Sequence, residues 1–94
     1  MTQVIKRGGK RRQIFSPSKI KKSIKGAARE AGFSASKAER VVNEVGDGVI
    51  NFFKKKRVVK SVDIRKSILR RLNRKAKAVA AKWRKFEKRK AGKF

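Results

Sequence analysis

The sequence predicts a mainly α-helical protein in which a small N-terminal β-hairpin packs on a bundle of four helices. Three observations lead to this fold class. A Gly-Gly pair lies between two short strand-like runs near the N-terminus, a Ser-Pro pair follows them, and the rest of the chain repeats apolar residues at intervals of three and four. A chain of 94 residues is long enough to form one hydrophobic core. We therefore expect a single domain over residues 1–94.

The hairpin is expected over residues 4–15. Residues 4–7 and 10–15 combine apolar and basic side chains, and Gly8-Gly9 joins them. Glycine readily adopts the positive φ angles that a two-residue hairpin turn needs. Because an isolated hairpin is only marginally stable in water, we expect it to pack against the helices.

The first helix is expected over residues 17–31. Ser16 is a typical N-cap residue, and Pro17 suits the first helical position because its missing N–H needs no partner there. Gly32 can adopt the left-handed conformation that ends many helices. The apolar stripe of this helix consists of Ile20, Ile24, Ala27, Ala28 and Ala31.

The second helix is expected over residues 36–54. Ser36 and Glu39 have the spacing of a capping box. Gly46 and Gly48 lie inside this helix, where each costs roughly 1 kcal/mol relative to alanine, so we expect a close contact with another part of the chain there. The apolar positions are Ala38, Val41, Val42, Val45, Val49, Phe52 and Phe53.

Two further helices complete the bundle. Ser61 is expected to cap the third helix, with Asp63 in its first turn, where the helix dipole favours negative charge, and Asn73 is expected to end it. The helical region as a whole spans residues 17–90, and residues 91–94 are expected to fray. The core positions are Ile64, Ile68, Leu69 and Leu72 in the third helix and Ala76, Val79, Ala80, Trp83 and Phe86 in the fourth.

The charge of the chain is strongly positive and unevenly distributed. It contains 31 Lys and Arg residues against 6 Asp and Glu residues, a formal net charge of +25. Residues 1–29, 30–53 and 54–94 carry net charges of +10, −2 and +17. Such an excess destabilises a compact state through self-repulsion unless a polyanion neutralises it. Because the basic segments also have regular apolar patterns, we expect basic surfaces on a folded core, with nucleic acid as the partner.

The composition excludes several other functions. Without Cys or His, the chain can form no disulfide and no thiolate or imidazole metal site. It also lacks the apolar run of a membrane helix or a signal peptide, so we expect a cytoplasmic protein with no membrane partner. The carboxylates are scattered and no phosphate-binding loop consensus is present, so we expect a binding protein that is not an enzyme and that requires no cofactor.

Nucleic-acid binding is the function that we expect from these charges. Few Asn and Gln side chains are available to read bases, which indicates largely sequence-neutral binding to double-stranded DNA, as in a chromatin or nucleoid-associated protein. Charge alone leaves RNA as an alternative. Most aromatic residues are expected in the core, and Phe33 is expected in a loop that folds inward, which argues against a stacking platform for single strands; Phe94 is the exception and has no expected partner. The candidate contacts are Lys10, Arg11 and Arg12 in the hairpin and Lys22 in the first helix. A cluster before the third helix consists of Lys54, Lys55, Lys56, Arg57 and Lys60, and Arg65 within that helix joins it. The candidates in the last helix are Lys82, Arg84, Lys85, Lys88, Arg89 and Lys90.

The acidic middle segment raises the question of self-association. Glu39, Glu44 and Asp47 are expected on the outer face of the second helix, where they keep that face soluble or pair with nearby Lys and Arg residues. The same face could pair with a basic face of a second copy. A homodimer or a higher assembly is therefore a hypothesis.

Several residues of this chain also fit the pattern of a known family. The first part contains Val4, Lys6, Arg7, Phe15, Lys19 and Ile20, and the last helix contains Ala80, Ala81, Trp83 and Phe86. With these residues in this order, the chain resembles the ATP-cone domain, found at the N-terminus of many ribonucleotide reductases and in the transcriptional repressor of reductase genes. The resemblance spans nearly the whole chain and implies an ATP-cone-like fold.

The resemblance also implies a ligand and a second function. ATP or dATP would bind between the hairpin and the first helix, with Val4, Lys6, Arg7 and Lys19 as the matching contacts. We expect no further domain after residue 94, so the alternative function is an ATP- or dATP-binding regulatory module that acts on a separate partner protein.

The chain departs from the family pattern around the hairpin turn. Gly8-Gly9 replaces the usual Asp-Gly, and Arg11, Arg12 and Gln13 stand where the family tends to have an acidic residue. Both departures remove negative charge. They make the hairpin a better contact for a phosphate backbone.

Overall fold

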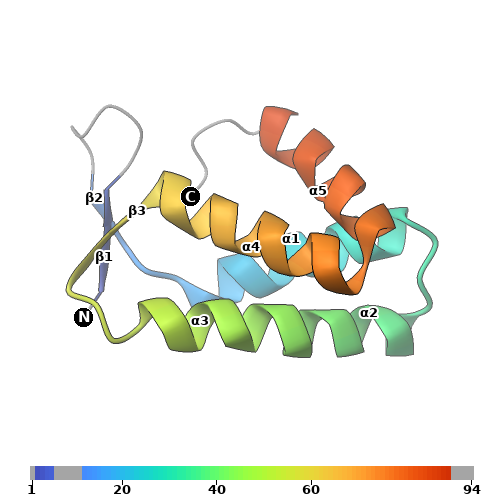
Figure 1. Ribbon diagram of the computed structural model, residues 1–94, viewed down its shortest axis with the longest axis horizontal. Coiled ribbons are helices and arrows are strands. Elements are labelled where there is room, and N and C mark those ends of the chain that lie inside the picture. The colour runs from blue at the N-terminus through green and yellow to red at the C-terminus, as the bar shows by residue number, and fades with distance from the viewer. Residues whose placement is uncertain (1, 6–11, 90–94) are drawn as a thin grey trace.

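A three-stranded sheet stands at one end of the helices (Figure 1). The computed structural model describes residues 2–5 and 12–89, with side chains up to residue 85. The strands are β1 (Gln3–Ile5), β2 (Arg12–Ile14) and β3 (Val58–Lys60), in the order β2-β1-β3. The remaining elements are helical, which confirms the mainly α fold class with four helices.

The central strand β1 pairs with two very different partners. It runs antiparallel to β2, with Val4 opposite Gln13, and parallel to β3, with Val4 opposite Val59. The antiparallel pair confirms the hairpin, although its strands are shorter than the predicted 4–7 and 10–15, and the turn lies outside the described residues. The sequence does not predict β3, because three residues are too few for a pattern and the strand that they pair with lies far away in the chain.

The first helix confirms its prediction in detail. Helix α1 (Pro17–Glu30) has Pro17 in its first turn, and the Ser16 Oγ accepts the Lys19 N–H at 3.4 Å. Gly32 follows the helix with a φ angle of 90°, the left-handed conformation that ends it. Four residues of the predicted stripe are buried, namely Ile20, Ile24, Ala27 and Ala28.

The second helix is continuous but consists of three segments. These are α2 (Ala35–Val41), the π-helical segment η1 (Val42–Gly46) and α3 (Asp47–Phe53). The close contact expected at the glycines is present at Gly48, where an added Cβ would lie only 2.5 Å from the Arg71 Nη1. The long helix therefore approaches the side chain of a residue far away in the sequence.

The start of the second helix corrects the prediction. Ser34, and not Ser36, is the N-cap residue, because its Oγ accepts the Lys37 N–H at 3.3 Å. The capping box assigned to Ser36 and Glu39 is therefore wrong. Both side chains are exposed within the first turns of the helix.

The last two helices differ from their predictions at the ends. Helix α4 (Ser61–Lys75) follows β3 directly, so Ser61 is its buried first residue and not its cap. Asn73 does not end α4, because the helix continues for two more residues. Ala76 then separates it from α5 (Lys77–Arg89). The predicted fraying of residues 91–94 lies outside the described residues.

The core lies where the four helices and the inner face of β1 meet. Helix α1 packs against α5, and α5 also packs against α4. The Trp83 indole N–H donates to the Ser23 Oγ at 3.1 Å, and the Ser23 hydroxyl donates to the Ile20 carbonyl at 2.8 Å. The buried apolar residues are Val4, Phe15, Ile20, Ile24, Ala27, Ala28, Ala38, Val42, Val45, Val49, Phe53, Val59, Ile64, Ile68, Leu72, Val79, Ala80 and Trp83.

One aromatic residue that was expected in the core lies at the surface. Phe52 is 55% exposed, whereas its neighbour Phe53 is only 4% exposed. Consecutive residues of a helix point about 100° apart, so Phe53 can face the interior while Phe52 faces the surface. The core placement of Phe52 is therefore wrong. Phe33, expected to fold inward, is half-buried and packs against the core.

Candidate functional site

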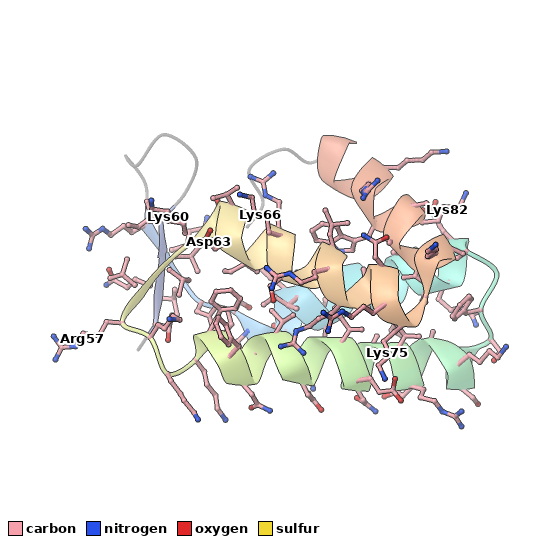
Figure 2. The ribbon with its side chains drawn as sticks, in the orientation of Figure 1. Arg57, Lys60, Asp63, Lys66, Lys75 and Lys82 are labelled. Carbon is pink, nitrogen blue, oxygen red and sulfur yellow. The ribbon has the colours of Figure 1, made fainter. Side chains whose placement is uncertain are left out.

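A groove runs between α3, β3 and α4, with a cavity volume of about 610 Å³. This volume falls within the range of about 300–1,000 Å³ that is typical of ligand sites. Figure 2 shows Lys60, Asp63 and Lys66 close together where β3 leads into α4. The lining residues are Ile5, Phe52, Phe53, Lys56, Val58, Val59, Lys60, Asp63, Lys66, Ser67, Arg70, Arg71 and Arg74.

The long wall of the groove is a basic face of α4. Lys66, Arg70 and Arg74 are spaced by four residues, so they form a row along one side of the helix. At a rise of 1.5 Å per residue, this row is about 12 Å long. The opposite side of the helix is held in the core by Ile64, Ile68 and Leu72. Core packing therefore fixes the direction in which the basic row points.

Lys56, Lys60 and Arg71 bring the number of cations in the groove to six, against one carboxylate, Asp63. Within residues 2–5 and 12–85, the ion pairs are Lys21–Asp47 at 3.0 Å and Lys75–Glu44 at 3.8 Å, and both lie outside the groove lining. The six cations therefore have no ion-pair partner among the described residues. Their combined field attracts an anion with several charges.

The floor of the groove is apolar and aromatic. The Phe52 and Phe53 rings meet edge to face, with centroids 4.9 Å apart. The Lys56 Nζ lies 5.2 Å from the centre of the Phe52 ring. An anion held by the cations would therefore lie next to an exposed aromatic ring.

Of the predicted nucleic-acid contacts whose side chains the structure describes, two line the groove. Lys56 and Lys60 line it, whereas Lys54, Lys55 and Arg57 are exposed nearby without lining it. In Figure 2, Arg57 points away from the molecule beyond the sheet. Arg12 is exposed on β2, where its Nη1 donates to the Gln3 Oε1 at 3.3 Å.

The other described candidates belong to different surfaces. Lys22 is exposed on α1, and Lys82, half-buried, lies on α5 with Arg84 and Lys85, which are exposed. Figure 2 places Lys82 on α5, at the end of the molecule away from the sheet. Candidates outside the described residues or side chains are Lys6, Arg7, Lys10, Arg11, Lys88, Arg89 and Lys90.

Four groove cations are missing from the predicted contacts: Lys66, Arg70, Arg71 and Arg74. The four-residue spacing of Lys66, Arg70 and Arg74, opposite the apolar stripe of α4, was visible in the sequence. What the spacing could not show is that β3 and the end of α3 pack beside this face and turn it into a groove.

A second basic position lies on another side of α4. Counting 100° per residue, Arg65 lies about 100–180° around the helix from the residues of the basic row, and it does not line the groove that Lys60 lines. Its Nε is buried and has no hydrogen-bond partner among the described residues. Leaving a buried donor unpaired costs about 1–3 kcal/mol.

The pairing of β1 with β3 brings the hairpin strand β1 close to α4, the helix that carries Arg65. Ile5, the last residue of β1, pairs with Lys60, which directly precedes α4. The end of β1 therefore lies beside the start of α4. Of the residues matched to the nucleotide contacts, Val4 is buried in β1 and Lys19 is exposed in the first turn of α1.

Two of the three acidic residues of the second helix form ion pairs within the chain. Glu39, Glu44 and Asp47 are exposed, as expected. Asp47 pairs with Lys21 of α1, and Glu44 pairs with Lys75 of α4, in agreement with pairing to nearby cations. These exposed pairs contribute at most about 1 kcal/mol each to stability.

Two negative findings concern the described residues. Over residues 2–5 and 12–89, no helix combines the length and the apolar character needed to cross a membrane. In the same part of the chain, no three Asp or Glu side chains gather in a way that could hold a metal ion.

A comparison with models of known protein families gives a match. The family model described as the ATP cone domain matches residues 2–89, which include the sheet, all four helices and both basic positions on α4. The comparison with curated proteins found no match.

Proposed function

Because the chain belongs to the ATP cone family over residues 2–89, a family of regulatory domains that bind ATP or dATP, we propose that it is a regulatory module whose occupancy by ATP or dATP controls a separate partner protein. The match to the family is the observation that carries this proposal. The role proposed is binding, not catalysis.

The nucleotide site proposed here lies beside the end of β1. Lys6 and Arg7 follow this strand in the sequence, and the first turns of α4 lie next to it. Arg65 adds a guanidinium whose buried Nε has no hydrogen-bond partner among the described residues, and guanidinium groups bind phosphate through charge-assisted hydrogen bonds. We include Lys19 by its match to the family. Arg65 is therefore a phosphate contact that was not assigned to the nucleotide from the sequence.

Thermal melting with ATP and with dATP tests this proposal. At a nucleotide concentration of about 100 times the Kd, the free energy of unfolding rises by about 2.7 kcal/mol, which corresponds to a Tm increase of more than about 10 °C. Lys19→Ala and Arg65→Gln are expected to reduce the increase. Lys25→Ala, an exposed change on the same helix as Lys19, is the matched control. A wild-type Tm that millimolar nucleotide leaves unchanged would contradict the proposal.

Binding to nucleic acid is a second candidate function, favoured by the groove. Six cations without ion-pair partners among the described residues line one cavity, and the whole chain carries a net charge of +25. Phosphate contacts of this kind supply most of the affinity of sequence-neutral binding. Such binding would place the protein on the nucleoid.

The salt dependence of binding tests the second function. Six phosphate contacts on duplex DNA predict that log K falls with log salt with a slope of about −5, so affinity falls by about 10³ between about 50 and 200 mM salt. Arg70→Gln with Arg74→Gln is expected to make the slope shallower by about 2. The control removes the same charge with Lys25→Gln and Lys77→Gln, both outside the groove. An equal effect of the two double variants would show that total charge, and not the groove, determines binding.

A further inference from the structure

We propose that the groove between α3, β3 and α4 binds single-stranded nucleic acid, with an unpaired base stacked on Phe52 and its phosphates held by the basic row of α4. This inference rests on nucleic-acid binding as proposed above. It adds that the nucleic acid is single-stranded and that Phe52 is the residue that distinguishes a single strand from a duplex.

The position of Phe52 is the first argument. The ring is 55% exposed although it lies on a helix whose other large apolar residues, including Phe53, are buried or half-buried. Its edge-to-face contact with the buried Phe53 ring holds it at the groove while leaving surface for a ligand. Aromatic rings beside cations are the usual stacking platforms for single strands, since every base has a π face.

Two groove cations lie near Phe52 or near its face of the helix. The Lys56 Nζ lies 5.2 Å from the centre of the Phe52 ring. Gly48 lies about one helical turn before Phe52, and the Arg71 guanidinium packs where a side chain at Gly48 would lie. The lack of a side chain at Gly48 therefore gives Arg71 room within the same groove, next to the aromatic platform.

The length of the basic row agrees with a short strand. Lys66, Arg70 and Arg74 span about 12 Å, so the row is long enough to contact more than one phosphate of a strand. A mononucleotide would use only part of this row. In a duplex, the faces of the bases are covered by their neighbours, so a duplex could use the cations but not Phe52. A single strand is the ligand that uses both.

Fluorescence anisotropy with labelled oligonucleotides of about 12 nucleotides tests the proposal on the full chain. The probes are oligo(dT), oligo(U) and a DNA duplex of the same length, and the variant is Phe52→Leu, which removes the ring but keeps an apolar side chain. We expect Phe52→Leu to weaken single-strand binding by about 5- to 150-fold and to leave duplex binding unchanged. Ile14→Ala, a change at a 64% exposed apolar residue outside the groove, is the control and should alter neither.

A second variant provides a direct signal and controls for folding. Phe52→Trp keeps an aromatic ring, so it should retain the single-strand affinity. Its added fluorescence should be quenched by oligo(dT) or oligo(U), whereas the buried Trp83 of the wild-type protein should respond little. Quenching by either oligonucleotide supports the proposal.

Three results would overturn the inference. The first is single-strand binding by Phe52→Leu that is as tight as that of the wild type. The second is a loss of duplex binding in this variant that equals its loss of single-strand binding. The third is displacement of oligo(dT) by ATP at equal concentration, which would indicate a mononucleotide site. In each of these cases the wild-type protein still binds nucleic acid, so these results would contradict the inference without contradicting nucleic-acid binding. If the wild type binds neither strands nor duplex at about 50 mM salt, both the second function and this inference fail.

Discussion

Replacing Gly48 with alanine should stabilise this protein, although the structure leaves no free space at that position. The added Cβ would lie 2.5 Å from the Arg71 Nη1 and 3.1 Å from its Cζ. Both atoms belong to the far end of a flexible side chain, which can move into the groove at little cost. No backbone atom outside the helix lies among the nearest contacts.

The gain comes from the helix itself. Alanine inside a helix is favoured over glycine by about 1 kcal/mol, because glycine loses more backbone entropy on folding. After the cost of moving Arg71, we expect a net gain of about 0.5–1 kcal/mol, or a Tm increase of about 2–8 °C for a domain of this size. Thermal unfolding followed by circular dichroism measures this directly.

Gly32 provides the matched comparison. Its added Cβ would contact nothing within 4 Å, so only its φ angle of 90° opposes a side chain. The left-handed conformation costs an alanine about 1–2 kcal/mol, so Gly32→Ala should lower the Tm. A lower Tm for Gly48→Ala would refute the reasoning, because it would mean that the Arg71 side chain is fixed in place. A Tm unchanged by Gly32→Ala would show that this helix end relaxes.

Three further predictions concern stability. Ser23→Ala should lower the free energy of unfolding by about 1–2 kcal/mol, because the buried Trp83 loses its hydrogen bond to Ser23. Urea denaturation measures this change, and an unchanged midpoint would contradict the prediction. Thr2→Val should lower the free energy of unfolding by about 1 kcal/mol in the same assay. The reason is that the Thr2 hydroxyl donates to the Lys56 carbonyl at 2.6 Å and so connects the residue before β1 to the segment after α3. Thr2→Ser, which keeps the donor, is the control. Finally, the Tm should rise between about 20 and 500 mM NaCl, because salt screens the repulsion among +25 charges, and a falling Tm would disprove that this repulsion limits stability.

The helices could be predicted because their signals are local. Ser16 and Pro17 start α1 and Gly32 ends it, and all three act on backbone groups within one turn. The errors at Ser36, Ser61 and Asn73 share one cause. Each is a residue type that commonly caps a helix, but a residue of that type can also lie inside a helix when the neighbouring elements favour a different boundary.

The site was predicted only in part. The excess of positive charge pointed to a polyanion, but four of the six groove cations were not assigned to it, because a basic helix face is ordinary solvated surface until other elements border it. The sequence also did not show which of Phe52 and Phe53 is buried. Both fit the apolar pattern, and the packing of the long helix against the rest of the core decides which one is buried.

The sequence by itself determined the mainly α fold class, the four helices, the strongly basic character and the ATP cone family. These follow from hydrophobic periodicity, capping residues and composition, whose energies depend on neighbours within a few positions. Only the tertiary structure decided the third strand, the groove and the exposed Phe52 ring. Each of these depends on contacts between residues far apart in the chain, such as Val4 with Val59 and Gly48 with Arg71, and local energies do not specify such contacts.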